Sequence, residues 1–370
     1  MATFNDLGIT KPFLDALAES NITEPSEIQL QTIPLLLRTP TDFVGQAQTG
    51  TGKTIAFGLP LLMKVDPTDP RVQALILAPT RELCQQISKQ LFRLTKYKRD
   101  IFITAVYGGE KIEDQLYKLS KPTQIVVATP GRLIDLLERK AIDLQYVENV
   151  VLDEADEMIS MGFKAEIETI LKQSNEQSFT WMFSATIPEE LNAIVATYMG
   201  AETQRVQINK RKVINTLIEH QYLICHGSHK TDYLTQFLKS QIKMSGMIFC
   251  KTKAMTATVA KQLIAKNISA DALHGDLEQR DRDKVMRAFK NGKIQYLVAT
   301  DIAARGIDID NLGFVVHYQL PDEMENYTHR SGRTARAGKR GISIAFVDPI
   351  ELKRLKVIEK ALGIQFVQIK

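Results

Sequence analysis

Cysteine is scarce in this chain of 370 residues, which contains only Cys84, Cys225 and Cys250. These three residues are far apart and form no CxxC pair, which argues against a disulfide framework and against a structural zinc site. No apolar run approaches the roughly 18 residues that a membrane span needs. Residues 1–6 have neither the basic start nor the apolar stretch of a secretory signal. These absences predict a cytoplasmic protein with no membrane partner.

Charge is distributed unevenly along the chain. Residues 1–205 carry 20 Lys and Arg against 27 Asp and Glu, whereas residues 206–370 carry 27 against 16. An acidic half joined to a basic half indicates that one side of the protein meets a polyanion. Solvated surface charge without a partner is the alternative, and charge alone does not decide between the two.

Short apolar segments alternate with segments of helical period. The expected strands are residues 43–44, 74–77, 101–103, 125–128, 150–152, 181–183, 222–224, 247–249, 296–299, 314–316 and 342–346. Strands that are almost entirely apolar are typical of a parallel sheet with helices on both faces. The polar stretch at 206–214 interrupts the pattern and is the expected linker. We therefore expect an α/β protein with two tandem domains, residues 1–205 and 215–370.

A glycine-rich segment follows the first expected strand and opens a helix. Its residues are Ala47, Gln48, Thr49, Gly50, Thr51, Gly52, Lys53 and Thr54. Glycines let successive N–H groups point at phosphate oxygens, aided by the helix N-terminus. Lys53 is placed to reach the β- and γ-phosphates, and the Thr54 hydroxyl is placed to ligate Mg²⁺. A strand-to-helix turn without a ligand is the alternative, but Gly-Lys-Thr in this context favours a nucleoside triphosphate site.

Acidic residues end the strand expected at residues 150–152. Asp153 at its tip is suited to holding Mg²⁺, usually through water. Glu154 is placed to orient and deprotonate the attacking water. An acidic strand end alone would more often be a solvated edge, but the phosphate loop about a hundred residues upstream favours a catalytic pair.

The run Asp153-Glu154-Ala155-Asp156 and the ordered motifs around it resemble the DEAD-box RNA helicases of superfamily 2, from Phe4 onward. The resemblance implies two RecA-like domains, ATP and Mg²⁺ as cofactors, and RNA as partner. Pro25-Ser26-Glu27-Ile28-Gln29 is similar to the Q motif, with Glu27 where relatives often have Pro. An amide can both donate to and accept from adenine, so Gln29 is expected to select that base. Phe4 is expected to stack on it.

The resemblance also implies RNA-binding residues after several expected strands. They are Pro79, Thr80, Arg81, Gly108, Gly109, Thr129, Pro130, Gly131 and Arg132 in the first half, and Gly275, Gln279, Arg282 and Thr300 in the second. Hydroxyls, backbone N–H groups and guanidinium groups grip a phosphodiester backbone without reading bases. Without the resemblance, most of these segments would be interpreted as strand-end turns.

Further roles rest on the resemblance alone. Asp308 is expected to reach the ATP ribose, and Arg333 and Arg336 are expected to be arginine fingers on the γ-phosphate, which raise hydrolysis rates by about 10³ to 10⁵. Ala335 stands between them where many relatives carry Gly. The residues expected to couple hydrolysis to strand separation are Asp156, Ser184, Thr186 and His329. Taken in isolation, the arginines of residues 329–338 would be a plain basic face.

These observations together predict an ATP-dependent RNA helicase whose two domains close on ATP and RNA and separate short duplexes. A DNA helicase or translocase is one alternative, which ATPase stimulation by RNA and by DNA would distinguish. A non-catalytic RNA clamp is the other, but it predicts loss of Lys53, Glu154 or Arg333, and all three are present. We expect a monomeric core trimmed from a longer protein, with no preference for a particular RNA encoded in it.

Overall fold

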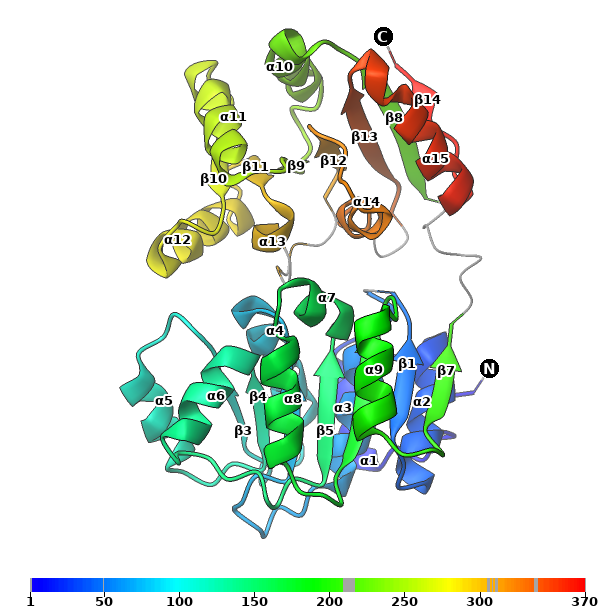
Figure 1. Ribbon diagram of the computed structural model, residues 1–370, viewed down its shortest axis with the longest axis vertical. Coiled ribbons are helices and arrows are strands. Elements are labelled where there is room, and N and C mark those ends of the chain that lie inside the picture. Colours follow the sequence, from blue (N-terminus) through cyan, green and yellow to red (C-terminus); the bar gives the residue numbers. More distant parts are fainter. Residues whose placement is uncertain are drawn as a thin grey trace. The chain divides into compact units, whose positions relative to one another are not determined.

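The computed structural model describes residues 2–48, 50–208, 217–304, 307, 309, 312–335 and 339–369. The chain divides into two compact units, Met1–Ile208 and Asn209–Lys370. Each unit contains a sheet of seven parallel strands flanked by helices (Figure 1). The predicted class, two tandem α/β domains, is therefore confirmed.

The first unit has the strand order β3-β4-β2-β5-β6-β1-β7. Its strands are β1 (Phe43–Gln46), β2 (Ala74–Leu77), β3 (Ile103–Val106), β4 (Ile125–Ala128), β5 (Asn149–Asp153), β6 (Phe179–Ser184) and β7 (Gln204–Gln207). Its helices are α1 (Lys11–Glu19), α2 (Glu27–Arg38), α3 (Lys53–Lys64), α4 (Arg81–Leu94), α5 (Ile112–Leu119), α6 (Pro130–Glu138), α7 (Ala155–Ser160), α8 (Lys164–Gln173) and α9 (Glu189–Tyr198).

Both faces of the first sheet are buried because successive side chains of a strand point to opposite faces. On β2, Ala74 and Ile76 join the apolar cluster formed with α1 to α4. Leu75 and Leu77 join the cluster formed with α6 to α9. This two-sided burial explains why the strands are almost continuously apolar in sequence.

The second unit has the strand order β10-β11-β9-β12-β13-β8-β14. Its strands are β8 (Ile218–Ile224), β9 (Gly246–Phe249), β10 (Ala270–Leu273), β11 (Tyr296–Ala299), β12 (Phe314–His317), β13 (Gly341–Val347) and β14 (Val367–Gln368). Its α-helices are α10 (Lys230–Ser240), α11 (Lys253–Ala265), α12 (Gln279–Lys290), α13 (Asp301–Ala304), α14 (Met324–Ser331) and α15 (Leu352–Leu362). Short 3-10 turns η2 (Gly227–His229) and η3 (Pro349–Glu351) precede α10 and α15.

The structure differs from the sequence expectation at the edges of both sheets. The stretch expected to be a linker begins with Val206 and Gln207, which instead belong to β7 and pair with β1. Residues 209–214 of that stretch lie outside the described part of the chain. Strands β7, β10 and β14 were not expected at all, because their sequences are short and carry polar residues. Within the described ranges, no helix has the length and apolarity required to cross a membrane.

Because all paired strands run parallel, their carboxyl ends lie at one edge of each sheet. In the first unit, the residues at or after these ends include all of its predicted site residues except Phe4 and Gln29. Ligands of open α/β sheets usually bind at this edge.

Candidate functional site

The phosphate loop joins β1 to α3. Gly50 and Gly52 have φ angles of 80° and 92°, a left-handed conformation that glycine adopts without steric cost. A Cβ atom at Gly52 would also collide with the Gln29 amide. The Lys53 side chain is 6% exposed, and its Nζ donates to the Ala47 carbonyl over 3.0 Å. The phosphate loop is thus sharply bent, and the Lys53 ammonium group is bonded to the backbone of the loop itself.

Other residues of the loop complete this turn. The Thr51 hydroxyl donates to the Gln48 carbonyl over 2.7 Å. Thr54 lies half-buried in the first turn of α3. Thr49 lies outside the described residues.

Two side chains at the start of α2 hold the phosphate loop in place. Gln29 is 3% exposed; its Oε1 accepts from the Ser26 backbone N–H (2.9 Å), and its Nε2 donates to the Gly52 carbonyl (3.0 Å). The Ser26 hydroxyl donates to the Thr51 carbonyl over 2.7 Å. Sequence reasoning assigned Gln29 to adenine and missed this second role. An amide has two donor hydrogens and two acceptor lone pairs, so both atoms retain capacity for another partner.

Phe4 lies in the core of the first unit. Its side chain is 3% exposed and belongs to the same apolar cluster as Leu7, Ile9 and Phe13. Burial of this kind is what an aromatic residue adopts for packing alone. Stacking of Phe4 on a base therefore stays a prediction.

Asp153 is the last residue of β5 and is 3% exposed. Its Oδ1 accepts from the Glu154 backbone N–H over 3.1 Å. Burial raises the pKa of Asp153 to about 7, although the nearby Lys53 charge acts in the opposite direction. A buried carboxyl held close to its titration point at a sheet edge is typical of a functional group.

Glu154 has a backbone conformation that is unusual for its residue type. Its φ angle is 52°, and it is the N-cap of α7. The left-handed region costs a non-glycine residue roughly 1–2 kcal/mol. Such strain persists where the surrounding structure dictates it, often at sites of function. The Glu154 side chain is half-buried at the start of α7, directly after the strand that carries Asp153.

Asp156 connects this turn to the segment that follows β6. Its Oδ2 accepts from the Thr186 backbone N–H (2.8 Å) and from the Thr186 hydroxyl (3.0 Å). The Ser184 hydroxyl accepts from the Asp156 backbone N–H (3.2 Å). The structure therefore brings together three of the four residues expected to couple hydrolysis to unwinding.

The same segment is tied to the phosphate loop. The Ala47 backbone N–H donates to the Ser184 carbonyl over 2.9 Å. The Gln46 side chain donates to the Ala185 carbonyl over 3.1 Å. A displacement at the phosphate loop can thus reach Asp156 through directly bonded groups.

Two arginines of the predicted RNA-binding set shape one loop of the first unit. The Arg81 Nη1 donates to the Gly109 carbonyl (3.2 Å), and the Arg132 Nη1 and Nη2 both donate to the Glu110 carbonyl (3.2 Å each). The Arg81 guanidinium lies 4.9 Å from the centre of the Tyr107 ring. The segments after β2, β3 and β4 are thereby held together. The sequence did not indicate the contribution of Tyr107 and Glu110.

The remaining predicted RNA-binding positions of this unit surround that loop. Thr80 is the N-cap of α4, and Thr129 is the N-cap of α6, whose first turn contains Pro130 and Gly131. Pro79 immediately precedes Thr80. A Cβ atom at Gly108 or Gly131 would meet nothing within 4 Å, so a ligand can approach the backbone closely at both.

The predicted RNA-binding residues of the second unit lie on α12 and around α13. The Thr300 hydroxyl accepts from the Ala303 backbone N–H (3.3 Å), and the Arg282 Nη2 donates to the Ala303 carbonyl (3.3 Å). Gln279, at the start of α12, donates to the Asp283 carboxylate over 2.9 Å. Gly275 is exposed between β10 and α12.

The sequence singled out no role for Arg330, which the structure shows to be a central connection. Its guanidinium is 1% exposed and makes two bonds to the Asp301 carboxylate, Nε to Oδ1 (2.5 Å) and Nη2 to Oδ2 (2.7 Å). Its Nη1 donates to the Gln319 carbonyl over 2.8 Å. Bidentate arginine–carboxylate pairs are strong and geometrically specific, so Arg330 fixes α14 against the start of α13.

Only part of the predicted arginine-finger set can be located. The Arg333 Nη1 donates to the Ile307 carbonyl over 2.9 Å. His329 is half-buried on α14. Arg336 and Asp308 lie outside the described residues, so their roles stay predictions.

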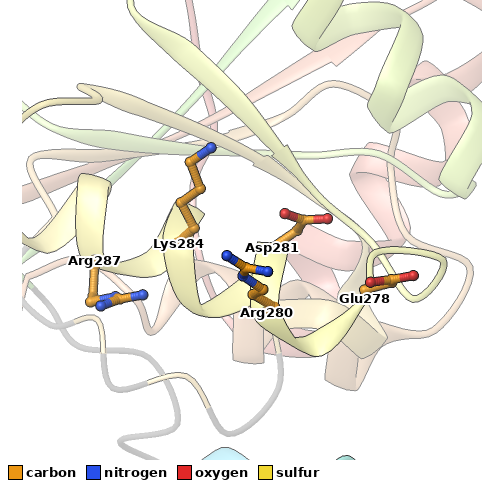
Figure 2. Close-up of a pocket in the computed structure, with 5 residues that line it drawn as sticks. All are labelled: Glu278, Arg280, Asp281, Lys284 and Arg287. Carbon is orange, nitrogen blue, oxygen red and sulfur yellow. The ribbon is translucent and has the colours of Figure 1, made fainter.

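Figure 2 shows a pocket of about 410 Å³ along α12, lined by Glu278, Arg280, Asp281, Lys284 and Arg287. All five side chains are charged and exposed. They lie opposite the residues of α12 that are buried, Val285 and Phe289. This pocket is therefore a hollow in a solvated charged surface, and it contains none of the residues predicted to bind nucleotide.

The expected metal, Mg²⁺, does not require a cage of protein ligands. Among the described residues, no group of three or more His, Cys, Asp or Glu is arranged to hold a metal ion. Mg²⁺ usually takes one or two protein oxygens and completes its octahedron with phosphate oxygens and water. The buried carboxylate of Asp153 and the hydroxyl of Thr54 are oxygen donors of that kind.

Comparisons with known proteins agree with this arrangement. Residues 26–194 match the DEAD/DEAH box helicase family, and residues 229–338 match the helicase conserved C-terminal domain. The ATP-dependent RNA helicase CshA of Listeria monocytogenes is 42% identical over 97% of this chain and 69% of the relative. The CshA of Bacillus cereus is 43% identical over 97% of this chain and 68% of the relative.

Solved structures of DEAD-box helicases also match this chain. Saccharomyces cerevisiae Dbp5 bound to RNA and ADP BeF3 has a TM-score of 0.91 at 30% identity, covering 100% of this chain and 96% of that one. Mss116p bound to single-stranded RNA and AMP-PNP has a TM-score of 0.89 at 29% identity, covering 100% and 80%. The extent of these matches, together with the ordered motifs, shows that the chain belongs to the DEAD-box ATP-dependent RNA helicase family.

Proposed function

We propose that this chain is an RNA-stimulated ATPase that uses ATP binding and hydrolysis to separate short RNA duplexes or remodel RNA–protein complexes. One observation carries the proposal: hydrogen bonds tie the phosphate loop to the segment after β6, and tie that segment to Asp156, which follows Asp153 and Glu154 at the same edge of the first sheet. The family match supports the same activity.

Each residue has a role that follows from its chemistry. Lys53 neutralises the β- and γ-phosphates once it leaves the Ala47 carbonyl. Asp153 and Thr54 would hold Mg²⁺, which would supply charge neutralisation on the phosphate oxygens when bound. Glu154 orients the attacking water and accepts its proton. Arg333, with Arg336, stabilises the charge that builds on the transferred phosphoryl group.

RNA binding is proposed for the segments that follow the sheet strands of both units. Arg81, Arg132 and Arg282 supply guanidinium groups, and the open backbone at Gly108 and Gly131 admits a phosphate. Contacts of this type hold a strand without reading its bases, so affinity should fall with salt and depend little on sequence. We also propose a cytoplasmic location, since Cys84, Cys225 and Cys250 are buried free thiols, as a reducing compartment allows.

The test measures ATP turnover and the unwinding of a short RNA duplex on the same preparation. Glu154→Gln retains size and polarity but cannot accept a proton, so turnover should fall by at least about a hundredfold while ATP and RNA still bind. Glu190→Gln, the same change at an exposed position on α9, is the matched control. Normal turnover in Glu154→Gln would show that another residue is the base.

Two further measurements define the nucleic acid and the metal. Single-stranded RNA should stimulate turnover far more than DNA of the same sequence, because 2′-hydroxyl contacts distinguish the two. Equal stimulation would contradict the RNA assignment and favour a DNA translocase. Chelation of Mg²⁺ should abolish turnover, and Asp153→Asn should raise the Mg²⁺ concentration needed to restore it.

A further inference from the structure

Five buried polar side chains form a single hydrogen-bonded cluster in the second unit. They come from four elements: His220 on β8, His317 on β12, Ser343 on β13, and Tyr327 and Ser331 on α14. None of the five is more than 5% exposed. Polar side chains are seldom buried in a core without a hydrogen-bond partner or a functional role, because apolar residues of similar shape pack there at a lower cost in free energy.

Ser343 is the centre of the cluster. Its Oγ lies 3.0 Å from the His317 Nε2, 3.3 Å from the Tyr327 hydroxyl and 2.8 Å from the Ser331 Oγ. The Ser331 Oγ also lies 3.3 Å from the His317 Nε2. The Tyr327 hydroxyl lies 2.7 Å from the His220 Nδ1, and the Tyr327 ring stacks on His317 with centroids 4.4 Å apart.

The direction of these hydrogen bonds follows from the two ring nitrogens that lack a partner. The His220 Nε2 and the His317 Nδ1 are buried without one. An unpaired N–H in a protein interior is rarer than an unpaired acceptor, so each histidine carries its proton on the other nitrogen. His220 then donates to Tyr327, and Tyr327 and His317 donate to Ser343. Ser343, having accepted two bonds, donates its one proton to Ser331.

The cluster thus reaches Ser331, the last residue of α14, two positions before Arg333. The neighbouring residue, Arg330, is fixed by its paired bonds to Asp301. The end of α14 is therefore held from two directions, by the cluster toward strands β12 and β13 and by Arg330 toward α13. Each of the five side chains makes at least one hydrogen bond within the cluster, and a buried polar network favours one arrangement of the elements that it joins, even though the His220 Nε2 and the His317 Nδ1 have no partner.

We propose that the His220–Tyr327–Ser343–His317–Ser331 cluster is a positioning device that sets the orientation of α14 so that Arg333 is aimed at the transferred phosphoryl group. The five are positioning residues, since all of them are buried in the core of the second unit and act through α14. This inference rests on the proposed role of Arg333 as an arginine finger. A guanidinium displaced by about 1 Å loses much of its effect, since misplacement on this scale costs a rate factor of up to about a hundred.

Two substitutions break the cluster with little change in shape. Ser343→Ala removes its centre, and Tyr327→Phe removes one oxygen while the ring stays stacked on His317. RNA-stimulated kcat should fall about tenfold in the first and about threefold in the second, with the KM for ATP and the affinity for RNA within about twofold of the parent. Tyr222→Phe is the matched control, because the Tyr222 hydroxyl bonds Gln368 and lies outside the cluster.

A double-mutant cycle separates positioning from general loss of structure. If the cluster acts through Arg333, adding Ser343→Ala or Tyr327→Phe to Arg333→Ala should reduce single-turnover hydrolysis no further than about twofold. An unchanged kcat in both single variants, or the same loss in the presence and absence of Arg333, would overturn the inference. The proposed function fails separately: it is contradicted if Arg333→Ala alone turns over ATP at the parent rate. Tyr327→Phe keeps the test decisive even if Ser343→Ala does not fold.

Discussion

The contact between Asp156 and Thr186 gives the sharpest test of how hydrolysis is coupled to unwinding. The Asp156 carboxylate accepts three hydrogen bonds, from the Thr186 hydroxyl, the Thr186 N–H and the Glu157 N–H, at 3.0, 2.8 and 3.1 Å. Thr186→Val keeps the branched shape and removes only the hydroxyl bond. A hydrogen bond to a charged group is worth about 1.5–3 kcal/mol, which corresponds to a factor of about 10 to 150. Because two backbone bonds remain, we expect the lower end of this range.

Unwinding and ATP turnover must be measured side by side on a short RNA duplex. Thr186→Val should lower the amount of duplex separated per ATP by about tenfold, while turnover stays within about threefold of the parent. Thr180→Val is the matched control, since Thr180 is a buried residue of β6 whose backbone N–H, rather than its hydroxyl, bonds Asp42. Equal losses of turnover and unwinding in Thr186→Val would refute the coupling role, as would no loss at all.

Three further predictions concern binding, the two units and pH. Gln29→Ala should abolish the preference for ATP over GTP and weaken ATP binding by about 1–3 kcal/mol. Nucleotide titration measures this loss, and equal affinities of the parent for ATP and GTP would show that Gln29 does not read adenine. The first unit alone, residues 1–208, should bind ATP weakly and show almost no ATP turnover, because Arg333 belongs to the second unit. Turnover at the rate of the whole chain in the same assay would mean that the hydrolytic site is complete without Arg333. Burial lowers the pKa of His220 to about 4 and that of His317 well below its ordinary value. Below a pH of about 6.5 the unfolded chain therefore binds more protons than the folded chain. Each histidine then lowers the free energy of unfolding by up to about 1.4 kcal/mol per pH unit as the pH falls from about 6.5 toward 4. Urea unfolding followed by circular dichroism should show this loss of stability in the second unit. The fluorescence of the single tryptophan, Trp181 in the first unit, should not show it. A second unit that is equally stable at pH 7 and pH 5 would contradict the prediction.

The class of fold followed from the sequence because a parallel sheet buried on both faces leaves a strong pattern. Residues such as 74–77 and 125–128 are apolar at every position, and the structure has strands there. The strand expected at 101–103 begins instead at Ile103 and runs to Val106; the exposed Phe102 precedes it, with its backbone N–H bonded to the Gln124 side chain. Edge strands such as β14 have too few buried positions to show a periodic pattern.

The sequence indicates candidate site residues where their proposed chemistry needs a contiguous motif. The phosphate loop and the pair Asp153 and Glu154 are of this kind. Contacts between distant segments left no such trace: the bond from Gln29 to Gly52 joins two motifs that sequence reasoning treated separately. His317 carried no signal either, because a histidine in an apolar strand is indistinguishable in sequence from one that merely fills space.

The left-handed backbone at Glu154 has a consequence for how this enzyme can evolve. Glycine would adopt the same turn without the roughly 1–2 kcal/mol that an L-residue incurs, but glycine has no carboxylate. Under the proposed role of Glu154 as the general base, stability and turnover oppose each other at this one position, because Glu154→Gly relieves the strain and removes the carboxylate. The fully buried strand β5, which ends directly before Glu154, supplies the stability that makes this strain tolerable.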